Sequence, residues 1–158
     1  SVASFDIALM KLCYADINAR TNVDELFKYY QGAMTALSRI MSGTTMLHCT
    51  VPLRSVRLGV RSYVRRVFGR PIVAIQDNSC RDAFNDLLRD AYSQSSQILD
   101  IAAIESTSPD GSLFGTPYRG VHVPALDPHY TDDGGHLNSE GQHRVASEFV
   151  QLINEMRL

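Results

Sequence analysis

Two side chains near the end of the chain have the types and the spacing of an acid–base pair. Asp133 precedes His136 by three residues in the stretch DDGGHLNSEGQHRVA, residues 132–146. A carboxylate so close along the chain can accept the Nδ1–H of the imidazole, which fixes the tautomer and leaves Nε2 free to take a proton. The alternative is a pair that only stabilises its own loop. If the pair is catalytic, it supplies two thirds of a nucleophilic triad, and the nucleophile has to be found.

The serines near these residues are poor candidates for the nucleophile. Ser139 is close to His136, but it stands where a helix is predicted to begin and forms a capping box with Gln142, so its hydroxyl should bind a backbone N–H. Ser1 and Ser4 precede a predicted strand instead of following one. None of the three has the strand-to-helix turn that exposes a nucleophilic serine.

Regularly spaced histidines raise the alternative of a metal site. His122, His129, His136 and His143 recur at intervals of seven, with several aspartates among them. The first three fall in an irregular segment and the fourth in a helix, so the spacing defines no common face. The short metal-binding patterns are missing as well. We therefore expect surface or loop histidines and no metal ion.

Alternating strands and helices must position the pair. The sequence predicts strands at 6–14, 44–51 and 97–104, the first buried on both faces. Helices are predicted from Asn22 to Gly43, over 77–95 with Asp77 or Asn78 as the cap, and from Ser139, with an irregular segment over 105–135. This order predicts an open parallel α/β sheet, in which sites collect at the carboxyl ends of the strands. The last helix is expected to bury a stripe of Val145, Ala146, Phe149, Ile153 and Met156.

The stretch 54–70 carries six arginines and no acidic residue, with apolar residues at helical spacing. It is typical of a basic amphipathic helix. One interpretation is a solvated face whose arginine stems cover apolar surface. The other is a lid or rim that attracts an anionic substrate, a membrane or a partner.

Composition narrows the function classes. The 158 residues are 44% hydrophobic and 20% charged, with a formal net charge of −2 and a pI of about 6.2. These values predict a single domain over residues 1–158 and give no reason to expect nucleic-acid binding. No apolar run is long enough for a membrane span, and no targeting signal indicates a compartment. Cys13, Cys49 and Cys80 have neither zinc nor disulfide spacing, so buried free thiols are expected.

Several segments together resemble one known family. The stretch YTDDGGHLNSEGQHRVA is similar to the last motif of the SGNH (GDSL) hydrolases, in which D-x-x-H precedes the C-terminal helix. Further similarities are carried, in the family's order, by DIALMKLCYADI, MLHCTVPL, NSCRDAFNDLLRDAY and ILDIAAIES. The resemblance implies a flavodoxin-like three-layer α/β/α sandwich with a parallel sheet. It also implies hydrolysis of small ester or acylated substrates without a cofactor, with Asp133 as the orienting acid and His136 as the base.

The sequence departs from the family in its oxyanion region. The family's G-x-N-D motif aligns with Cys13, Tyr14, Ala15 and Asp16, so an alanine methyl replaces the asparagine that donates to the oxyanion. The loss of one such donor typically costs about 100- to 1000-fold in rate. Asn18 or a backbone N–H is the expected substitute, and Asp16 is expected to organise the loop. Tyr14 and His48 are candidates for the rim of the site, with a structural role as the alternative for His48.

A second departure from the family concerns the nucleophilic serine. In the family the nucleophilic serine follows a strand upstream of the G-x-N-D strand, and the resemblance implies that this serine and the first two strands lie outside these 158 residues. We therefore expect either a companion N-terminal segment or self-association to cover the edge of the strand at 6–14. The alternative is a catalytically degenerate module used for binding or assembly.

Overall fold

The computed structural model describes residues 5–56, 72–92 and 97–156. Most of the basic stretch 54–70, for which the sequence predicts a helix, lies outside these ranges. The elements in chain order are β1 (Ile7–Met10), α1 (Val23–Ile40), β2 (Thr45–Cys49), α3 (Val73–Tyr92), β3 (Ile98–Leu99), α4 (Ile101–Ser106), β4 (Gly115–Tyr118), β5 (Val121–Pro124), the 3-10 helix η2 (Pro128–Tyr130) and α5 (Ser139–Met156).

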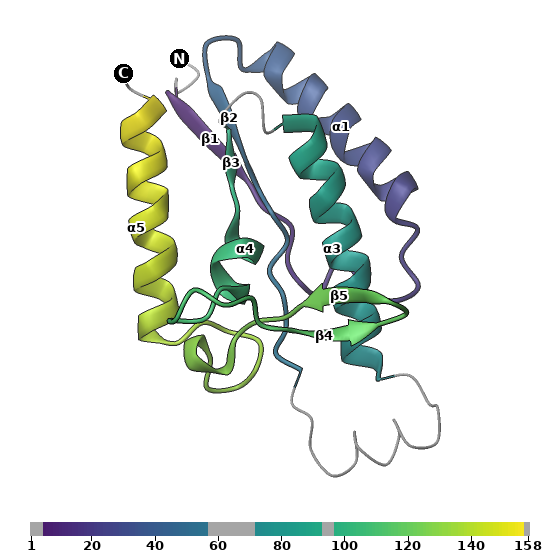
Figure 1. Ribbon diagram of the computed structural model, residues 1–158. Coiled ribbons are helices and arrows are strands. Elements are labelled where there is room, and N and C mark those ends of the chain that lie inside the picture. Colours follow the sequence, from purple (N-terminus) through teal and green to yellow (C-terminus); the bar gives the residue numbers. More distant parts are fainter. Residues whose placement is uncertain (1–4, 57–71, 93–96, 157–158) are drawn as a thin grey trace.

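A parallel sheet forms the centre of the fold, with the strand order β1-β2-β3. Ile7 pairs with Thr45, and His48 pairs with Ile98. Helices α1 and α3 lie on one side of this sheet and α5 on the other (Figure 1). The predicted fold class is confirmed, because this mixed α/β arrangement with a parallel sheet is that of a flavodoxin-like α/β/α fold.

Strand β2 contributes side chains to the apolar clusters on both faces of the sheet, since successive side chains of a strand point in opposite directions. Met46 belongs to the apolar cluster that includes Tyr30 of α1 and Phe84 of α3. Cys49 packs on the opposite side with Leu99, against which Phe149 of α5 is placed. The alternation explains why β2 is almost wholly buried.

Strand β1 does not match the prediction of burial on both faces. Leu9 is 46% exposed and the adjoining Phe5 is 57% exposed. Within the described sheet β1 is an outer strand that pairs with β2 alone, so fewer neighbours cover it. Its open edge lies at the side of the sheet.

Helix α1 begins and ends as its sequence predicts. The backbone N–H of Glu25 donates to Asn22 Oδ1, and Asn22 Nδ2 donates to Glu25 Oε2, both over 3.3 Å. This is the predicted capping box. Beyond Ile40 the chain turns at Gly43, whose φ of +101° suits a residue without a Cβ.

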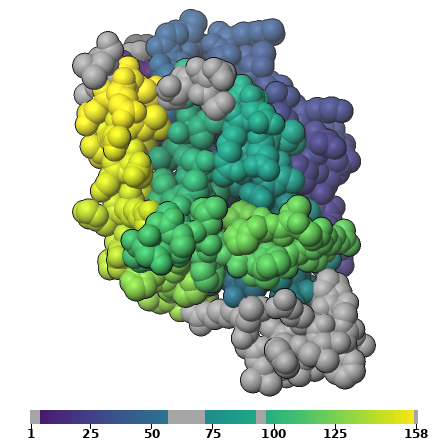
Figure 2. Space-filling view, in the orientation of Figure 1, coloured from purple at the N-terminus to yellow at the C-terminus, as the bar shows by residue number. Residues whose placement is uncertain are grey.

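Helix α3 begins earlier than predicted, and its predicted cap is wrong. It starts at Val73, and Ile75 in its first turn is buried in a cluster with Val123 of the β4–β5 hairpin. Asp77 instead accepts the backbone N–H of Ala19 over 2.8 Å, and Asn78 is fully buried inside the helix. In the space-filling view the hairpin lies across α3, on the side of the molecule away from α5 (Figure 2).

The third strand and the segment after it also differ from the prediction. Strand β3 has two residues, because Asp100 Oδ1 accepts the backbone N–H of Ala103 and caps helix α4 at that point. The segment predicted as irregular contains η2 and the β4–β5 hairpin. The hairpin turns at Arg119 and Gly120, both of which have positive φ, as a two-residue turn requires.

Helix α5 begins at Ser139 as predicted, but its cap is the residue before. Asn138 Oδ1 accepts the backbone N–H of Gly141 over 3.1 Å, and the side chain of Ser139 is exposed. The predicted apolar stripe is only half-buried. Val145 and Phe149 pack against the sheet, whereas Ala146 is exposed.

The cysteines occupy three different environments as free thiols. Cys49 is buried, Cys80 is half-buried and Cys13 is exposed, so burial was wrongly predicted for Cys13. Cys13 is exposed because it follows β1 in the turn at the open end of the sheet. Within the described ranges, no helix has the length and apolar character to cross a membrane.

Candidate active site

Asp133 and His136 form a directly bonded pair on the loop before α5. Asp133 Oδ2 lies 2.6 Å from His136 Nδ1. The other carboxylate oxygen, Oδ1, accepts the backbone N–H of Gly135 over 2.7 Å and that of His136 over 2.8 Å. The carboxylate therefore orients both the imidazole and the backbone that carries it.

These bonds keep Asp133 ionised. The hydrogen bond from the His136 side chain, followed by those from the backbone N–H groups of His136 and Gly135, holds the pKa of Asp133 well below its usual range. The His136 side chain is 75% exposed, and Nε2 forms no hydrogen bond within the described residues. The imidazole thus presents Nε2 outward while its Nδ1 is held.

Two further contacts hold the loop in place. Thr131 and Leu137 form an isolated antiparallel bridge across its base. The backbone N–H of Ser55 donates to the carbonyl of Gly134 over 3.0 Å, which joins the loop to the segment that follows β2. Gly134 itself has a φ of +84°, a conformation that glycine adopts without strain.

Tyr14, in the turn that follows β1, lies beside the Asp133–His136 pair. Its ring meets that of His136 edge to face, with 5.9 Å between centroids. The guanidinium carbons of Arg54 and Arg81 lie 5.4 Å and 5.9 Å from the centroid of Tyr14, and Arg81 Nε donates to the Tyr14 carbonyl over 2.9 Å. Tyr14 thus borders the pair.

Two buried asparagines of α3 hold the segment that follows β2. Asn85 accepts the backbone N–H of Val51 over 2.6 Å and donates to its carbonyl over 3.0 Å. Asn78 makes the same two contacts with Arg54, over 3.1 and 2.7 Å. Both side chains are fully buried, although their spacing along the helix would also suit an exposed polar face. In the sequence, Asn78, Arg81 and Asn85 form an N-x-x-R-x-x-x-N pattern, which is the signal that could have indicated this role.

Glu105 is a second buried polar residue near these segments that no sequence pattern indicated. Its Oε2 accepts the backbone N–H of Leu53 over 2.9 Å, and the residue is 3% exposed. Burial raises the pKa of Glu105 to about 7, and the Leu53 bond and the charge of Lys11 oppose this shift only in part.

The remaining predicted residues of the oxyanion region lie in the turn after β1. Asp16 accepts the backbone N–H of Cys13 over 2.7 Å, which stabilises this turn. Asn18 Oδ1 accepts the backbone N–H of Arg20, so its carboxamide oxygen serves its own loop. Ala15 is exposed and offers only a methyl group.

The structure separates His48 from the other candidates. Its ring stacks on Tyr92 of α3 and bonds to Tyr30 of α1, on the face of the sheet that these helices cover. It therefore lies apart from the rim that Tyr14 forms beside His136. Elsewhere in the described ranges, no group of three or more His, Cys, Asp and Glu side chains could hold a metal ion.

The fold is that of an α/β protein of the flavodoxin-like type, with a hydrogen-bonded Asp–His pair on the loop before its last helix. Among solved structures, the chain is similar to a protein from Streptococcus pneumonia that is provisionally described as a platelet activating factor. The two share 17% identity and a TM-score of 0.62, over 94% of this chain and 60% of the other. No protein-family model and no curated protein matches the chain. The likeness supports the fold, and this chain spans less than two thirds of its neighbour.

Proposed function

We propose that this chain carries the acid–base part of an SGNH-type serine hydrolase that acts on ester or acyl groups. One observation carries the proposal, namely the 2.6 Å contact between Asp133 Oδ2 and His136 Nδ1 with Nε2 left exposed. An imidazole held in this way is prepared to accept the proton of an attacking hydroxyl. The similarity to the streptococcal structure is compatible with this fold.

In the proposed reaction a serine hydroxyl attacks the ester carbonyl carbon and passes its proton to His136 Nε2. The Asp133 carboxylate stabilises the imidazolium that forms. As the carbon–oxygen ester bond breaks, the imidazolium gives its proton to the leaving alcohol, and an acyl-serine remains. Water then attacks the acyl group by the same route and releases the acid, which restores the serine.

The serine is proposed to come from a segment outside these 158 residues that pairs beside β1. The exposed Leu9 and Phe5 support this location, because an open apolar edge favours pairing with a further strand. A parallel strand added there would end on the same side of the sheet as Tyr14. A residue just after such a strand would therefore approach His136.

Arg54 favours substrates with a negative charge close to the ester. Its backbone is fixed by Asn78, and its guanidinium lies over the Tyr14 ring. Within the described part of the chain its side chain forms no ion pair. An anionic group on the substrate would supply the missing counter-charge.

A module that binds without hydrolysis is the second candidate function, and Ala15 favours it. The position that aligns with the oxyanion donor of the SGNH family carries a methyl group. Asn18, the expected substitute, uses its carboxamide oxygen within its own loop. The amide Nδ2–H of Asn18 or a backbone N–H would then have to replace the donor.

The test compares the 158-residue chain with the full-length product of its reading frame, using a fluorophosphonate probe and a short-chain p-nitrophenyl ester. We expect labelling and hydrolysis by the full-length protein and neither by the chain alone. His136→Ala should abolish both activities, and Asp133→Asn should lower hydrolysis by roughly 10⁴-fold, as is typical of triads. The matched control is His143→Ala, which removes an exposed histidine of α5. If the full-length protein does not react, the non-catalytic module is favoured instead. If it reacts without His136, the proposed role of the Asp133–His136 pair is refuted.

A further inference from the structure

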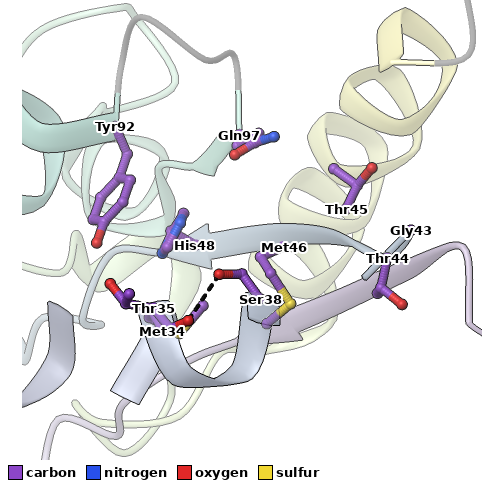
Figure 3. Close-up of a pocket in the computed structure, with 10 residues that line it drawn as sticks. All are labelled: Met34, Thr35, Ser38, Gly43, Thr44, Thr45, Met46, His48, Tyr92 and Gln97. Atoms are coloured by element: carbon purple, nitrogen blue, oxygen red, sulfur yellow. Dashed lines mark hydrogen bonds between the residues drawn. The ribbon is translucent and has the colours of Figure 1, made fainter. Parts of the chain in front are cut away.

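A groove lies on the α1 and α3 side of the sheet, at the end opposite to Tyr14 and His136. It is open to solvent and has a volume of about 450 Å³, within the range of small-molecule sites. Its walls come from the second half of α1, the start of β2, the end of α3 and the residue before β3. The lining residues are Met34, Thr35, Ser38, Gly43, Thr44, Thr45, Met46, His48, Tyr92 and Gln97 (Figure 3).

His48 supplies a polar group to this groove from a buried position. The residue is 3% exposed, and its Nδ1 lies 2.7 Å from the hydroxyl oxygen of Tyr30. The other ring nitrogen, Nε2, has no hydrogen bond to any described residue. Among the described residues Nε2 is not one of the fully enclosed side-chain atoms without a partner, so it is accessible from the groove and can bond a ligand there.

The Tyr30 contact decides what kind of partner Nε2 needs. Burial raises the pKa of Tyr30, so the phenol keeps its proton, and burial lowers the pKa of His48, which favours a neutral ring. Within the described residues the Tyr30 hydroxyl has His48 as its hydrogen-bond partner. It is best satisfied by donating to Nδ1, which leaves the proton of the imidazole on Nε2. His48 therefore offers a hydrogen-bond donor.

The rest of the groove is uncharged. Tyr92 stacks on His48 with 3.7 Å between ring centroids, which continues the aromatic surface. The side chains of Met34 and Met46 add a soft apolar wall, and the other lining residues carry hydroxyl groups, an amide or no side chain. Because none of the lining residues is Asp, Glu, Lys or Arg, nothing in this wall compensates a charged ligand.

We propose that this groove binds an uncharged small molecule with an aromatic or aliphatic body and a carbonyl-type acceptor, and that His48 Nε2–H donates to this acceptor. The body lies against the methionines and the edge of the Tyr92 ring. The site is distinct from the proposed hydrolytic site. The groove lies near Gly43, at the end of the sheet where β2 starts, whereas Tyr14 and His136 lie beyond the other end. The inference stands whether or not the chain belongs to a hydrolase.

The test uses three uncharged aryl amides as probes, namely N-methylbenzamide, acetanilide and nicotinamide. Each is titrated into the protein while the methyl signals of Met34 and Met46 and the ring signals of His48 are followed by NMR. We expect saturable shifts of these signals with at least one probe, and at least tenfold weaker binding of benzoate. Absence of saturable binding by all three probes would show that the groove holds only water and would overturn the proposal. Benzoate binding as tightly as the amides would overturn it too.

Two substitutions localise the binding. Thr35→Trp fills the groove from an exposed position of α1 without changing the core, so it should abolish binding. Gln31→Trp places the same ring one turn earlier on α1, outside the groove, and should bind like the unaltered protein. His48→Phe keeps a ring in the wall but lacks the donor, and binding should weaken at least tenfold. Binding that survives Thr35→Trp would place the probes elsewhere and would refute the proposal.

Discussion

The ring of Tyr14 meets the ring of His136 edge to face at 5.9 Å, although 122 positions separate the two residues. This contact joins the end of β1 to the loop before α5. Since Asp133 holds the imidazole at Nδ1, Tyr14 limits its remaining freedom to tilt. The candidate base is thus positioned from two sides, once by its own loop and once by the sheet.

Tyr14→Ala should loosen His136 without breaking its bond to Asp133. The substitution removes the ring that contacts His136 and the two arginines, whereas Tyr14→Phe keeps that ring and is the matched control. We expect a lower order parameter for the His136 ring in the alanine variant alone, measured by NMR relaxation. In an active full-length hydrolase, kcat should fall by roughly 10- to 100-fold, because small misplacements of a catalytic group are costly. Equal ring mobility in both variants would contradict this role.

Glu105→Gln should change how stability depends on pH. The pKa of Glu105 is raised from 4.5 to about 7, so the folded protein retains a proton that the unfolded chain releases at lower pH. Its contribution to stability is fully present below about pH 4.5, is lost as the pH rises towards 7 and then stays constant. Glutamine keeps an acceptor for the Leu53 N–H but cannot ionise, so relative to wild type the variant should gain up to about 3 kcal/mol between pH 4.5 and 8.

Urea denaturation at pH 4.5 and at pH 8 measures this change. Glu140→Gln, at an exposed position in the first turn of α5, is the control and should show no such gain. The buried-acid interpretation fails if Glu105→Gln and wild type lose stability in parallel across this range.

Asn85→Ala should strongly destabilise the protein. The amide of Asn85 satisfies both the N–H and the carbonyl of Val51, and both residues are fully buried. Its removal leaves two buried backbone groups without these partners, at a cost of about 2–4 kcal/mol. Asn154→Ala, at an exposed position of α5, should change the free energy of unfolding by less than about 0.5 kcal/mol. Similar losses for the two variants in chemical denaturation would mean that Asn85 does not hold the segment.

The three thiols should react in a fixed order with a disulfide reagent at pH 8. Cys13 is exposed and should react first, and Cys80 is half-buried and should follow. Cys49 should react only on unfolding, because burial blocks access and raises its pKa to about 11. Cys13→Ser should remove the fast phase alone. A fast phase that persists in this variant would show that another thiol is accessible.

The features that the sequence predicted correctly are those that depend on near neighbours along the chain. Asn22 and Glu25 form their capping box because three residues separate them at a helix start. The contact between Asp133 and His136 is equally local, since a short glycine turn lets the carboxylate reach the imidazole. The order of strands and helices likewise indicated a parallel sheet, because a strand followed by a crossover helix returns in the same direction.

Which polar side chains are buried was decided only by the tertiary structure. Asn78 and Asn85 recur at a spacing that also suits an exposed helix face, and they are buried because the segment after β2 offers backbone groups that need partners. The cap of α5 moved from Ser139 to Asn138 because Asn138 also donates to the carbonyl of His129. The packing of Tyr14 on His136 and the open edge of β1 depend on which strands lie side by side. Spacing along a chain determines which groups can meet locally, whereas burial depends on what distant segments place opposite them.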